Sequence, residues 1–284
     1  LPKFVYQDKC QAECWRCNYG CPYGAKWNAR FFVEAAQANG GELINGAKVD
    51  RVIVENKKAV GVEYKKRFKT HQAFADKIIL GAGGIGSPVI LRHSGIHDAG
   101  YDYFYDPLIA VVGTVKDVQG GHEFPMATGV HMDEEGYVMT DMTVPRSLYM
   151  LFAAGGLRPH KALSHSKALT IMIKAKDSLG GRVTYNGGVR KALARSDKEK
   201  LLKGYDRARD ILKNAGAKSV FKSSYIAAHP GGTVKVGDII DSDLKTEYDN
   251  LYVCDCSVIP EAWGLPPTFT LLALGKRLAK HLTV

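Results

Sequence analysis

Four of the six cysteines lie close together near the start of the chain, at Cys10, Cys14, Cys17 and Cys21, and Pro22 follows the last of them. Thiols at this spacing can reach one centre only when the chain wraps around it as a loop. Cysteine thiolates are the usual ligands of iron–sulfur clusters, and short gaps with a proline after the last cysteine approach the run found in bacterial ferredoxins. The spacing therefore predicts an iron–sulfur cluster, and four ligands favour a 4Fe–4S cluster over a 3Fe–4S cluster.

Two other interpretations of these cysteines stay open. Zinc is also held by four closely spaced cysteines. Disulfides or free thiols are the third interpretation, although two bridges packed this tightly are sterically awkward. Residues 1–30 contain few aliphatic side chains, so we expect a cysteine-rich loop that a bound centre holds in place. Cys254 and Cys256 lie in an apolar segment and are predicted to be small buried residues.

A glycine-rich segment, Gly81-Ala-Gly-Gly-Ile-Gly86, matches the G-x-G-x-x-G pattern of dinucleotide-binding turns. It follows a predicted strand at 77–80 and precedes a predicted short helix that begins at Pro88 and continues to Leu91. No strand that ends in an acidic residue follows at the usual distance of about 20 residues. An NAD-linked reductase that uses this turn is therefore an alternative hypothesis and not the leading one.

The pattern of apolar residues predicts a chain of mixed α and β structure. Alternation at 48–55 and 59–64 predicts a β-hairpin, and Asn186-Gly187 is a strong signal for a second hairpin. The apolar run Leu108–Val112 predicts a buried strand. The remaining predicted elements are a helix at 30–38, a helix at 197–214 capped by Ser196, a strand at 250–255 and a helix at 270–282.

Composition and charge narrow the classes of function. The chain has 39 basic and 29 acidic residues, a net charge of +10, but the basic residues are spread along it. We therefore expect a solvated surface and no nucleic-acid binding, with a docking face for an acidic partner as the alternative. No stretch approaches the roughly 18–20 apolar residues of a membrane-spanning helix, and no secretory signal opens the chain. A cytoplasmic location is expected, with membrane association through a partner as an alternative.

Several segments together resemble one family of enzymes. They are Gly83-Gly-Ile-Gly-Ser-Pro-Val-Ile-Leu-Arg-His-Ser-Gly-Ile96, His229-Pro-Gly-Gly-Thr233, Asp255-Cys-Ser-Val-Ile-Pro260 and Pro266-Pro-Thr268. Their order and spacing resemble the sequence signatures of the glucose–methanol–choline (GMC) family of flavin-dependent oxidoreductases. Cys21-Pro-Tyr-Gly-Ala-Lys26 also resembles iron–sulfur-containing members of this superfamily.

The resemblance implies roles for individual residues. His229 is the implied catalytic base, which takes the proton of the substrate hydroxyl as a hydride leaves for the flavin; imidazole suits this role because it titrates close to neutral pH. A second histidine or asparagine usually completes the site in this family, whereas Pro266 stands in that place here. The implied FAD contacts are Val49, Gly81, Ala82, Gly83, Gly84, Asp255, Cys256, Pro267 and Thr268.

The resemblance also implies a fold class. It is α+β or α/β, with an incomplete FAD-binding, Rossmann-like domain and an antiparallel-sheet substrate domain. The expected segments are a cluster-binding loop at 1–30, part of the FAD-binding domain at 31–97, the substrate domain at 98–228, and a return to the FAD-binding domain with the catalytic histidine at 229–284.

The function implied is FAD-dependent oxidation of an alcohol, polyol or sugar hydroxyl. Electrons are expected to pass through the iron–sulfur cluster to an external acceptor protein. GMC proteins also contain a G-x-G-x-x-G turn whose helix N-terminus holds the FAD pyrophosphate. No such turn precedes Cys10, so a second polypeptide or a cleaved N-terminal segment is expected to supply it in a hetero-oligomer. A non-catalytic electron-transfer or assembly subunit of a flavoprotein complex is the alternative from another class.

Overall fold

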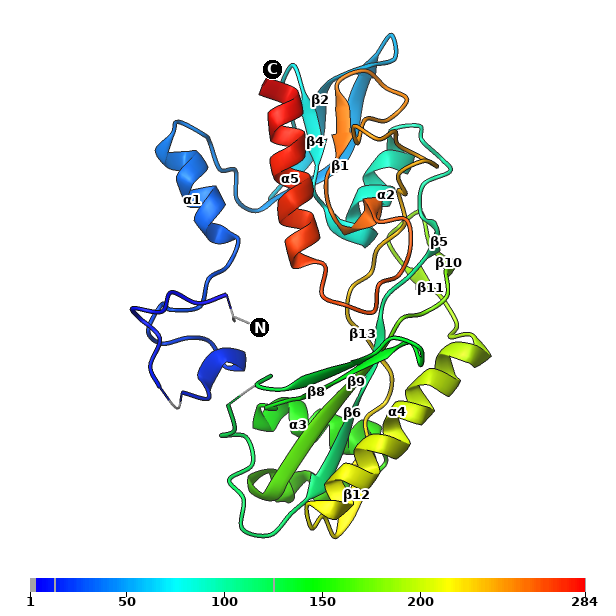
Figure 1. Ribbon diagram of the computed structural model, residues 1–284. Helices are drawn as coiled ribbons and strands as arrows, with labels where there is room; N and C mark the ends of the chain where they lie inside the picture. The colour runs from blue at the N-terminus through cyan, green and yellow to red at the C-terminus, as the bar shows by residue number, and fades with distance from the viewer. Residues whose placement is uncertain (1–3, 13, 125, 284) are drawn as a thin grey trace. The chain divides into compact units, whose positions relative to one another are not determined.

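The computed structural model describes residues 4–12, 14–124 and 126–283 and contains two compact units (Figure 1). Unit 1 is made of the N-terminal segment to Ile44, Leu108–Ala175 and Glu199–Ile226. Unit 2 is made of Asn45–Pro107, Lys176–Lys198 and the C-terminal segment from Ala227. These boundaries differ from the predicted segments, because residues 176–198 fall in unit 2 and the cysteine-rich loop falls in unit 1. The functional division of the chain stays a prediction.

An antiparallel sheet is the framework of unit 1. Its strand order is β12-β6-β9-β8-β7, and β13 also pairs with β6. The strands are β6 Pro107–Thr114, β7 Gly129–Met132, β8 Tyr137–Asp141, β9 Ala168–Ala175, β12 Ser219–Lys222 and β13 Ile226–Ala227. The predicted buried strand is confirmed in β6, whose residues are nearly all buried.

Helices pack on both faces of this sheet. The helical segments of unit 1 are η1 Arg16–Asn18, α1 Arg30–Ala38, α3 Arg146–Gly155, η2 Pro159–Lys167 and most of α4 Arg195–Asn214. Ala110 and Val112 of β6 share a core cluster with Phe152 of α3. Gly113 of β6 lies so close to Leu212 of α4 that a Cβ atom there would be tightly packed. Because successive residues of a strand point to opposite faces, α3 and α4 cover opposite faces of β6.

The start of α4 differs from the prediction. The helix begins at Arg195, so Ser196 lies inside it and is not its cap. Asp197 lies in the first turn, and its buried carboxylate accepts hydrogen bonds from the backbone N–H and the hydroxyl of Ser178. A carboxylate is favourable near a helix N-terminus because the first N–H groups leave a partial positive charge there.

Unit 2 contains several small sheets. The predicted hairpin is confirmed as β1 Ala47–Glu55 and β2 Lys58–Lys66, joined at Asn56-Lys57, where both residues have positive φ. A third antiparallel strand, β3 Lys69–Phe74, was not predicted. The Asn186-Gly187 hairpin is confirmed as β10 Gly180–Val183 and β11 Val189–Arg190, and β5 Tyr101–Tyr103 pairs with β10 on its other side.

A short parallel pair joins segments of unit 2 that lie far apart in the sequence. Strand β4 Ile78–Leu80 pairs with β14 Leu251–Val253 in register. The glycine-rich turn follows β4, and Asp255 follows β14. Because both strands run in the same direction, the two following segments emerge at the same edge. The other elements of this part of unit 2 are α2 Gly83–His93, η3 Cys256–Val258 and α5 Thr268–Thr283.

Helix α2 is longer than predicted, because it begins at Gly83 and contains Pro88. A proline inside a helix lacks the N–H that would bond to the carbonyl four residues earlier. Here that carbonyl belongs to Gly84, and it accepts a hydrogen bond from the hydroxyl of Thr233 instead, at 2.9 Å. The helix therefore continues through the proline because a distant side chain replaces the missing donor.

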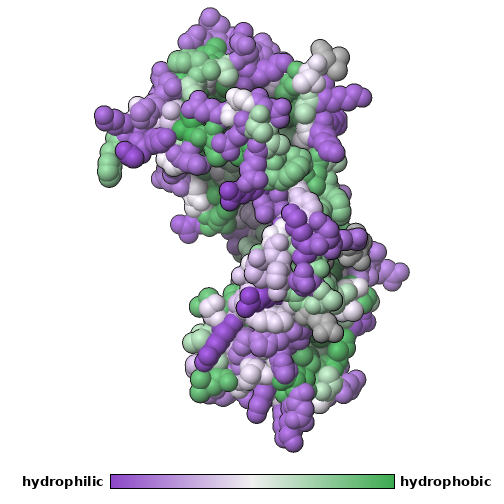
Figure 2. Space-filling model, turned by 90° about the vertical axis from the view of Figure 1, so that its left-hand side faces the viewer, coloured by the Kyte–Doolittle hydropathy of each residue, from purple (hydrophilic) through white to green (hydrophobic). Residues whose placement is uncertain are grey.

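Helices, antiparallel sheets and a parallel strand pair together confirm the predicted α+β class. On the face drawn in Figure 2, hydrophilic and hydrophobic residues are interspersed. Within the described ranges, none of the helices combines the length and the apolar character that crossing a membrane requires.

Candidate active site and cofactor site

His229 is hydrogen-bonded to a buried carboxylate within unit 2. Its side chain is 27% exposed, and its Nδ1 atom lies 3.1 Å from Oδ2 of Asp106, which is 1% exposed. The other carboxylate oxygen of Asp106 accepts the backbone N–H of Gly264 at 3.2 Å. Because a carboxylate only accepts hydrogen bonds, Nδ1 of the neutral imidazole carries the hydrogen. This leaves Nε2 with a lone pair that can accept a proton.

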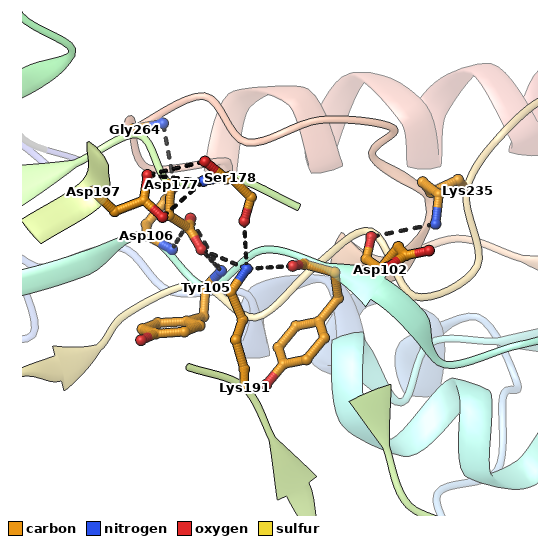
Figure 3. Close-up of polar contacts among 10 residues, drawn as sticks. Asp102, Tyr105, Asp106, Asp177, Ser178, Lys191, Asp197, Lys235 and Gly264 are labelled. Atoms are coloured by element: carbon orange, nitrogen blue, oxygen red, sulfur yellow. Dashed lines mark hydrogen bonds and ion pairs between the residues drawn. The ribbon is translucent and has the colours of Figure 1, made fainter. Parts of the chain in front are cut away.

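A second buried acid fixes the backbone of Asp106 (Figure 3). The carboxylate of Asp177 accepts the N–H groups of Asp106 at 3.0 Å and of Tyr105 at 3.3 Å, and pairs with Lys191 at 2.8 Å. The Lys191 ammonium also donates to the carbonyl of Ser178 at 2.6 Å. Burial raises the pKa of Asp177, and the hydrogen bond from Lys191 opposes this shift. Because both side chains of the pair are almost completely buried, losing either one would leave a costly unpaired charge.

The loop that holds His229 packs directly on the glycine-rich turn. A Cβ atom on Gly84 would overlap the carbonyl of Pro230, so this close approach requires glycine. The hydrogen bond from Thr233 to Gly84 lies in the same contact. Close backbone packing and one side-chain hydrogen bond thus hold the segment 229–233 against the start of α2.

Asp255 connects the C-terminal segment to the same turn. Its carboxylate accepts hydrogen bonds from the N–H of Gly83 at 2.9 Å, from the hydroxyl of Ser87 at 2.5 Å and from the N–H of Ser257 at 2.7 Å. The residue is 8% exposed. The structure therefore brings together two segments for which the sequence predicts FAD contacts, although the Asp255 carboxylate itself is used to join them.

A pocket of about 680 Å³ lies beside the glycine-rich turn. Its lining includes Val49, Gly81 and Ala82, all predicted FAD contacts, together with mainly apolar side chains. A Cβ atom on Gly83 would meet no other atom within 4 Å, so the turn also opens onto free space. An apolar pocket next to an exposed glycine backbone fits a dinucleotide, because the phosphates need close approach to backbone N–H groups.

The remaining predicted FAD contacts do not line this pocket. Cys256 packs against Gly231, where a Cβ atom would meet its Sγ atom at 2.9 Å. Burial raises the pKa of Cys256 to about 12, with Asp255 and Asp106 adding to the shift. Burial likewise raises the pKa of Cys254. Both thiols therefore stay protonated at neutral pH, although the two residues are partly buried and not fully buried as predicted.

Pro267 and Thr268 lie at the start of α5. The Pro267 carbonyl accepts the N–H of Leu271 at 3.0 Å, and the helix begins at Thr268. The N–H groups of a first helical turn have no acceptor within the helix. The first turn of α5 can therefore donate to a polar ligand edge, which is the contact predicted for Thr268.

Residues 4–12 and 14–30 of the cysteine-rich loop belong to unit 1. A β-bridge between Val5 and Lys26 closes it. The Tyr19 hydroxyl lies 2.9 Å from the carbonyl of Gly121 and 3.1 Å from that of Val144. Burial acts to raise the pKa of the Cys21 thiol, but backbone N–H groups of the next residues outweigh it and lower that pKa.

The four clustered cysteines do not converge on one point. All four are free and partly buried. Across residues 4–12, 14–124 and 126–283, no group of three or more histidine, cysteine or acidic side chains is arranged to hold a metal ion. The thiols as placed therefore do not fit an iron–sulfur cluster or a zinc ion, and the prediction of a metal centre rests on their spacing.

Sequence reasoning missed the groups around His229. The three groups, Asp106, Asp177 and Lys191, are far from His229 in the sequence. Asp106, which contacts His229 directly, is 123 positions away from it. One available signal was that Asp106 and Asp177 each flank an apolar strand, β6 and β9. Acidic residues are rarely buried unless paired, so this placement alone does not identify a partner.

Comparison with known proteins gives matches over both ends of the chain. Residues 4–114 match the N-terminal domain and residues 181–275 the C-terminal domain of the family described as GMC oxidoreductase. The uncharacterized protein MJ1450 of Methanocaldococcus jannaschii is 25% identical over 99% of this chain and 70% of its own length. Long-chain-alcohol oxidase FAO3 of Arabidopsis thaliana is 23% identical over 95% of this chain, and the match spans 47% of the oxidase.

Solved structures share the fold. Pyridoxine 4-oxidase from Mesorbium loti superposes with a TM-score of 0.63 at 16% identity, over 83% of this chain and 57% of that one. A formate oxidase variant from Aspergillus oryzae RIB40, studied for FAD modification, gives a TM-score of 0.67 at 16% identity, over 82% of this chain and 59% of that one. The chain thus has the fold of these oxidases while spanning little more than half their length.

Proposed function

The chain belongs to the GMC oxidoreductase family, and we propose on this basis that it forms part of an FAD-dependent enzyme that oxidises an alcohol, polyol or sugar hydroxyl. The observation that carries the proposal is the pairing of His229 with buried Asp106 in a loop packed on the glycine-rich turn. A general base and a dinucleotide-type pocket in one unit are the two parts that such an oxidation requires. The similarity to long-chain-alcohol oxidase FAO3 supports an alcohol as the substrate class.

Bound FAD would supply the acceptor for the hydride that leaves the carbinol carbon. Val49, Gly81 and Ala82 would hold the dinucleotide in the 680 Å³ pocket. Further contacts are proposed from Gly83, Gly84, Asp255, Cys256, Pro267 and Thr268. The open space at Gly83 and the N-terminal turn of α5 support these positions.

The proposed role of His229 is to accept the hydroxyl proton at Nε2. Loss of this proton raises electron density on the oxygen and favours departure of the hydride from the adjacent carbon. Asp106 acts as a positioning residue, because its carboxylate keeps the hydrogen on Nδ1 and balances the positive charge of the imidazole after proton transfer. Pro266 offers no side-chain hydrogen bond, so in this proposal His229 works without the second polar residue usual in the family.

The test is the rate at which an alcohol reduces the flavin. Replacing His229 by alanine should slow this step by about 10²–10⁴-fold, which is the range for loss of a general base. The amount of FAD bound per chain should be the same in His229→Ala as in the wild type. The matched control is His71→Ala, because His71 is exposed in β3, away from the glycine-rich turn. Flavin reduction at the wild-type rate in His229→Ala would contradict the assignment.

A metal centre at Cys10, Cys14, Cys17 and Cys21 is a separate proposal. It is supported by the spacing of the four cysteines, because thiolates at short gaps are the usual ligands of such centres. Iron and acid-labile sulfide in the purified protein would support an iron–sulfur cluster. Stoichiometric zinc without iron would overturn the iron–sulfur assignment, and the absence of both metals would overturn the metal centre itself.

We also propose that a further polypeptide segment completes the cofactor site, with an electron-acceptor protein as a second partner. Ile79 of β4 is 51% exposed although both neighbouring strand residues are buried. Ile79 also lines the 680 Å³ pocket, so bound FAD could cover part of it. Strand β4 forms a two-stranded sheet with β14, and its other edge could pair with a strand of a further segment. Intact-mass analysis of the purified FAD-bound sample tests this, since a lone 31.1 kDa species that retains FAD through gel filtration would refute it.

A further inference from the structure

A second pocket in unit 2 is lined by basic and aromatic side chains. It has a volume of about 380 Å³ and lies between the end of α2, strand β5 and the hairpin of β10. Arg92 and Arg182 line it, together with His97, Tyr101 and Tyr185. None of these residues lines the 680 Å³ pocket beside the glycine-rich turn. The proposed oxidation leaves this second pocket without a role.

Arg92 is a buried cation with unused hydrogen-bond donors. The residue is 6% exposed, and its Nη1 atom donates to the carbonyl of Val183 at 2.5 Å. Its Nε and Nη2 atoms have no hydrogen-bond partner among the residues that the structure describes. Burying a charged group without satisfying its donors is costly. The guanidinium is therefore a source of positive potential in the wall of the pocket that Arg92 lines.

Two features hold the guanidinium in a fixed position. Its Cζ atom lies 4.8 Å from the centre of the Tyr101 ring, a cation–π contact that favours a flat orientation. A Cβ atom on Gly100 would overlap Nη2, so the absence of a side chain there makes room for the group. Gly100 also has φ of +100°, which glycine tolerates and other residues do not. A preorganised guanidinium is what the recognition of a planar or tetrahedral oxyanion requires.

Arg182 adds a second positive charge at the same pocket. It lies opposite Tyr101 of β5 and opposite Arg190 of β11 in the antiparallel sheet. Directly opposite residues project from the same face. Over the part of the chain that the structure describes, no carboxylate forms an ion pair with Arg92, Arg182 or Arg190. Like charges gathered without a counterion favour an anionic ligand.

We propose that this pocket binds an oxyanion, a phosphate or carboxylate group carried by a small organic molecule. Arg92 supplies a buried positive charge at the base of the pocket, while its Nε and Nη2 atoms are themselves enclosed by the protein. Arg182 supplies a second charge at the rim, and the imidazole of His97 can donate a further hydrogen bond. The volume exceeds that of a bare phosphate, and the rings of Tyr101 and Tyr185 offer surfaces for an organic body.

Isothermal titration of the FAD-saturated protein at low ionic strength tests the proposal, with inorganic phosphate and citrate as separate probes. Saturation with FAD keeps the probes out of the cofactor pocket. We expect saturable binding with one site per chain. Tighter binding of phosphate would identify a phosphate site, and tighter binding of citrate a carboxylate site. Absence of saturable binding for both probes overturns the proposal.

Two arginine variants in the same hairpin make the test specific. Arg182→Gln should weaken binding at least tenfold. Arg190→Gln removes the same charge from a residue that does not line the pocket, and a unit charge roughly 7 Å away in water changes binding by about threefold or less. If both variants weaken binding equally, the probe responds to the overall positive charge of the surface, and the proposal of a specific site is wrong.

A third variant tests the geometry at the base of the pocket. Arg92→Lys keeps the charge but loses the planar group that packs on the Tyr101 ring and is held in place there, so it should weaken binding of the preferred probe at least threefold. Should Arg92→Lys fail to fold, the comparison of Arg182→Gln with Arg190→Gln decides the matter alone. A folded Arg92→Lys protein that binds as tightly as the wild type refutes the assigned role of Arg92.

Discussion

Replacing Asp106 by asparagine keeps the shape of this side chain and removes its charge. The carboxylate accepts hydrogen bonds from Nδ1–H of His229 at 3.1 Å and from the N–H of Gly264 at 3.2 Å. An asparagine has one acceptor oxygen and one donating NH₂ group, so it can satisfy only one of these two donors. When its oxygen faces Gly264, its NH₂ group donates to Nδ1 and forces the imidazole hydrogen onto Nε2. That tautomer cannot accept the substrate proton.

The size of the effect follows from these contacts. The opposite amide orientation keeps the productive tautomer but places NH₂ against the N–H of Gly264. Such an unsatisfied buried donor costs about 1–3 kcal/mol. Loss of a hydrogen bond to a charged group adds about 1.5–3 kcal/mol, and the lower end applies because His229 is 27% exposed. The two contributions together give about 2.5–4.5 kcal/mol, and at about 1.4 kcal/mol per factor of ten flavin reduction should slow by about 10²–10³-fold.

The assay is anaerobic single-turnover reduction of bound FAD by a saturating alcohol. Substrate affinity in Asp106→Asn should change by less than about threefold, because the substrate is not expected to contact Asp106. Asp102→Asn is the matched control. Asp102 lies in β5, four residues before Asp106, and its φ of +48° is one that asparagine tolerates. Its backbone carbonyl, which the substitution keeps, contacts Lys235. Flavin reduction at the wild-type rate in Asp106→Asn would refute the reasoning. An equal decrease of this rate in Asp106→Asn and Asp102→Asn would refute it as well.

The remaining predictions concern stability and thiol reactivity. Lys191→Met should lower the free energy of unfolding by about 3–5 kcal/mol in urea titrations, because a buried carboxylate loses its ion-pair partner; a loss under about 1 kcal/mol would contradict this. Thr233→Val should cost about 1–3 kcal/mol by leaving the Gly84 carbonyl unpaired, whereas Thr233→Ser should stay near the wild type. In metal-free protein at neutral pH, alkylation mapped by mass spectrometry should reach Cys21, whose lowered pKa raises its thiolate fraction, well before Cys256, whose pKa of about 12 keeps it a thiol. Equal labelling of both thiols would count against these shifts.

Local sequence patterns predicted the elements whose form depends on near neighbours. The hairpin of β1 and β2, the Asn186-Gly187 hairpin and helix α1 occur where alternation, turn residues and periodicity placed them. Helix α2 was predicted too short because Pro88 was taken as its start. The compensating hydroxyl comes from Thr233, far along the chain, and no local pattern contains that information.

In the candidate site, too, residues in local motifs were predictable and residues brought together by the fold were not. His229 and the glycine-rich turn were identified because they lie in contiguous motifs. Asp106, Asp177 and Lys191 were not, since a buried ion pair depends on which distant loops meet in the fold. For the cysteines, the local pattern is clear but the structure does not match it. Among the described residues, the thiols are not arranged to hold a metal ion. Cysteines that hold a metal often come together only when the metal is bound.

Anaerobic mixing of the purified protein with alcohols tests the central claim most directly. The sample should include any polypeptide that copurifies, and the flavin absorbance should be recorded over time. The proposed function predicts that the protein contains FAD and that an alcohol bleaches its absorbance, whereas NADH does not. A protein without flavin, or a flavin that NADH reduces and no alcohol does, would contradict it.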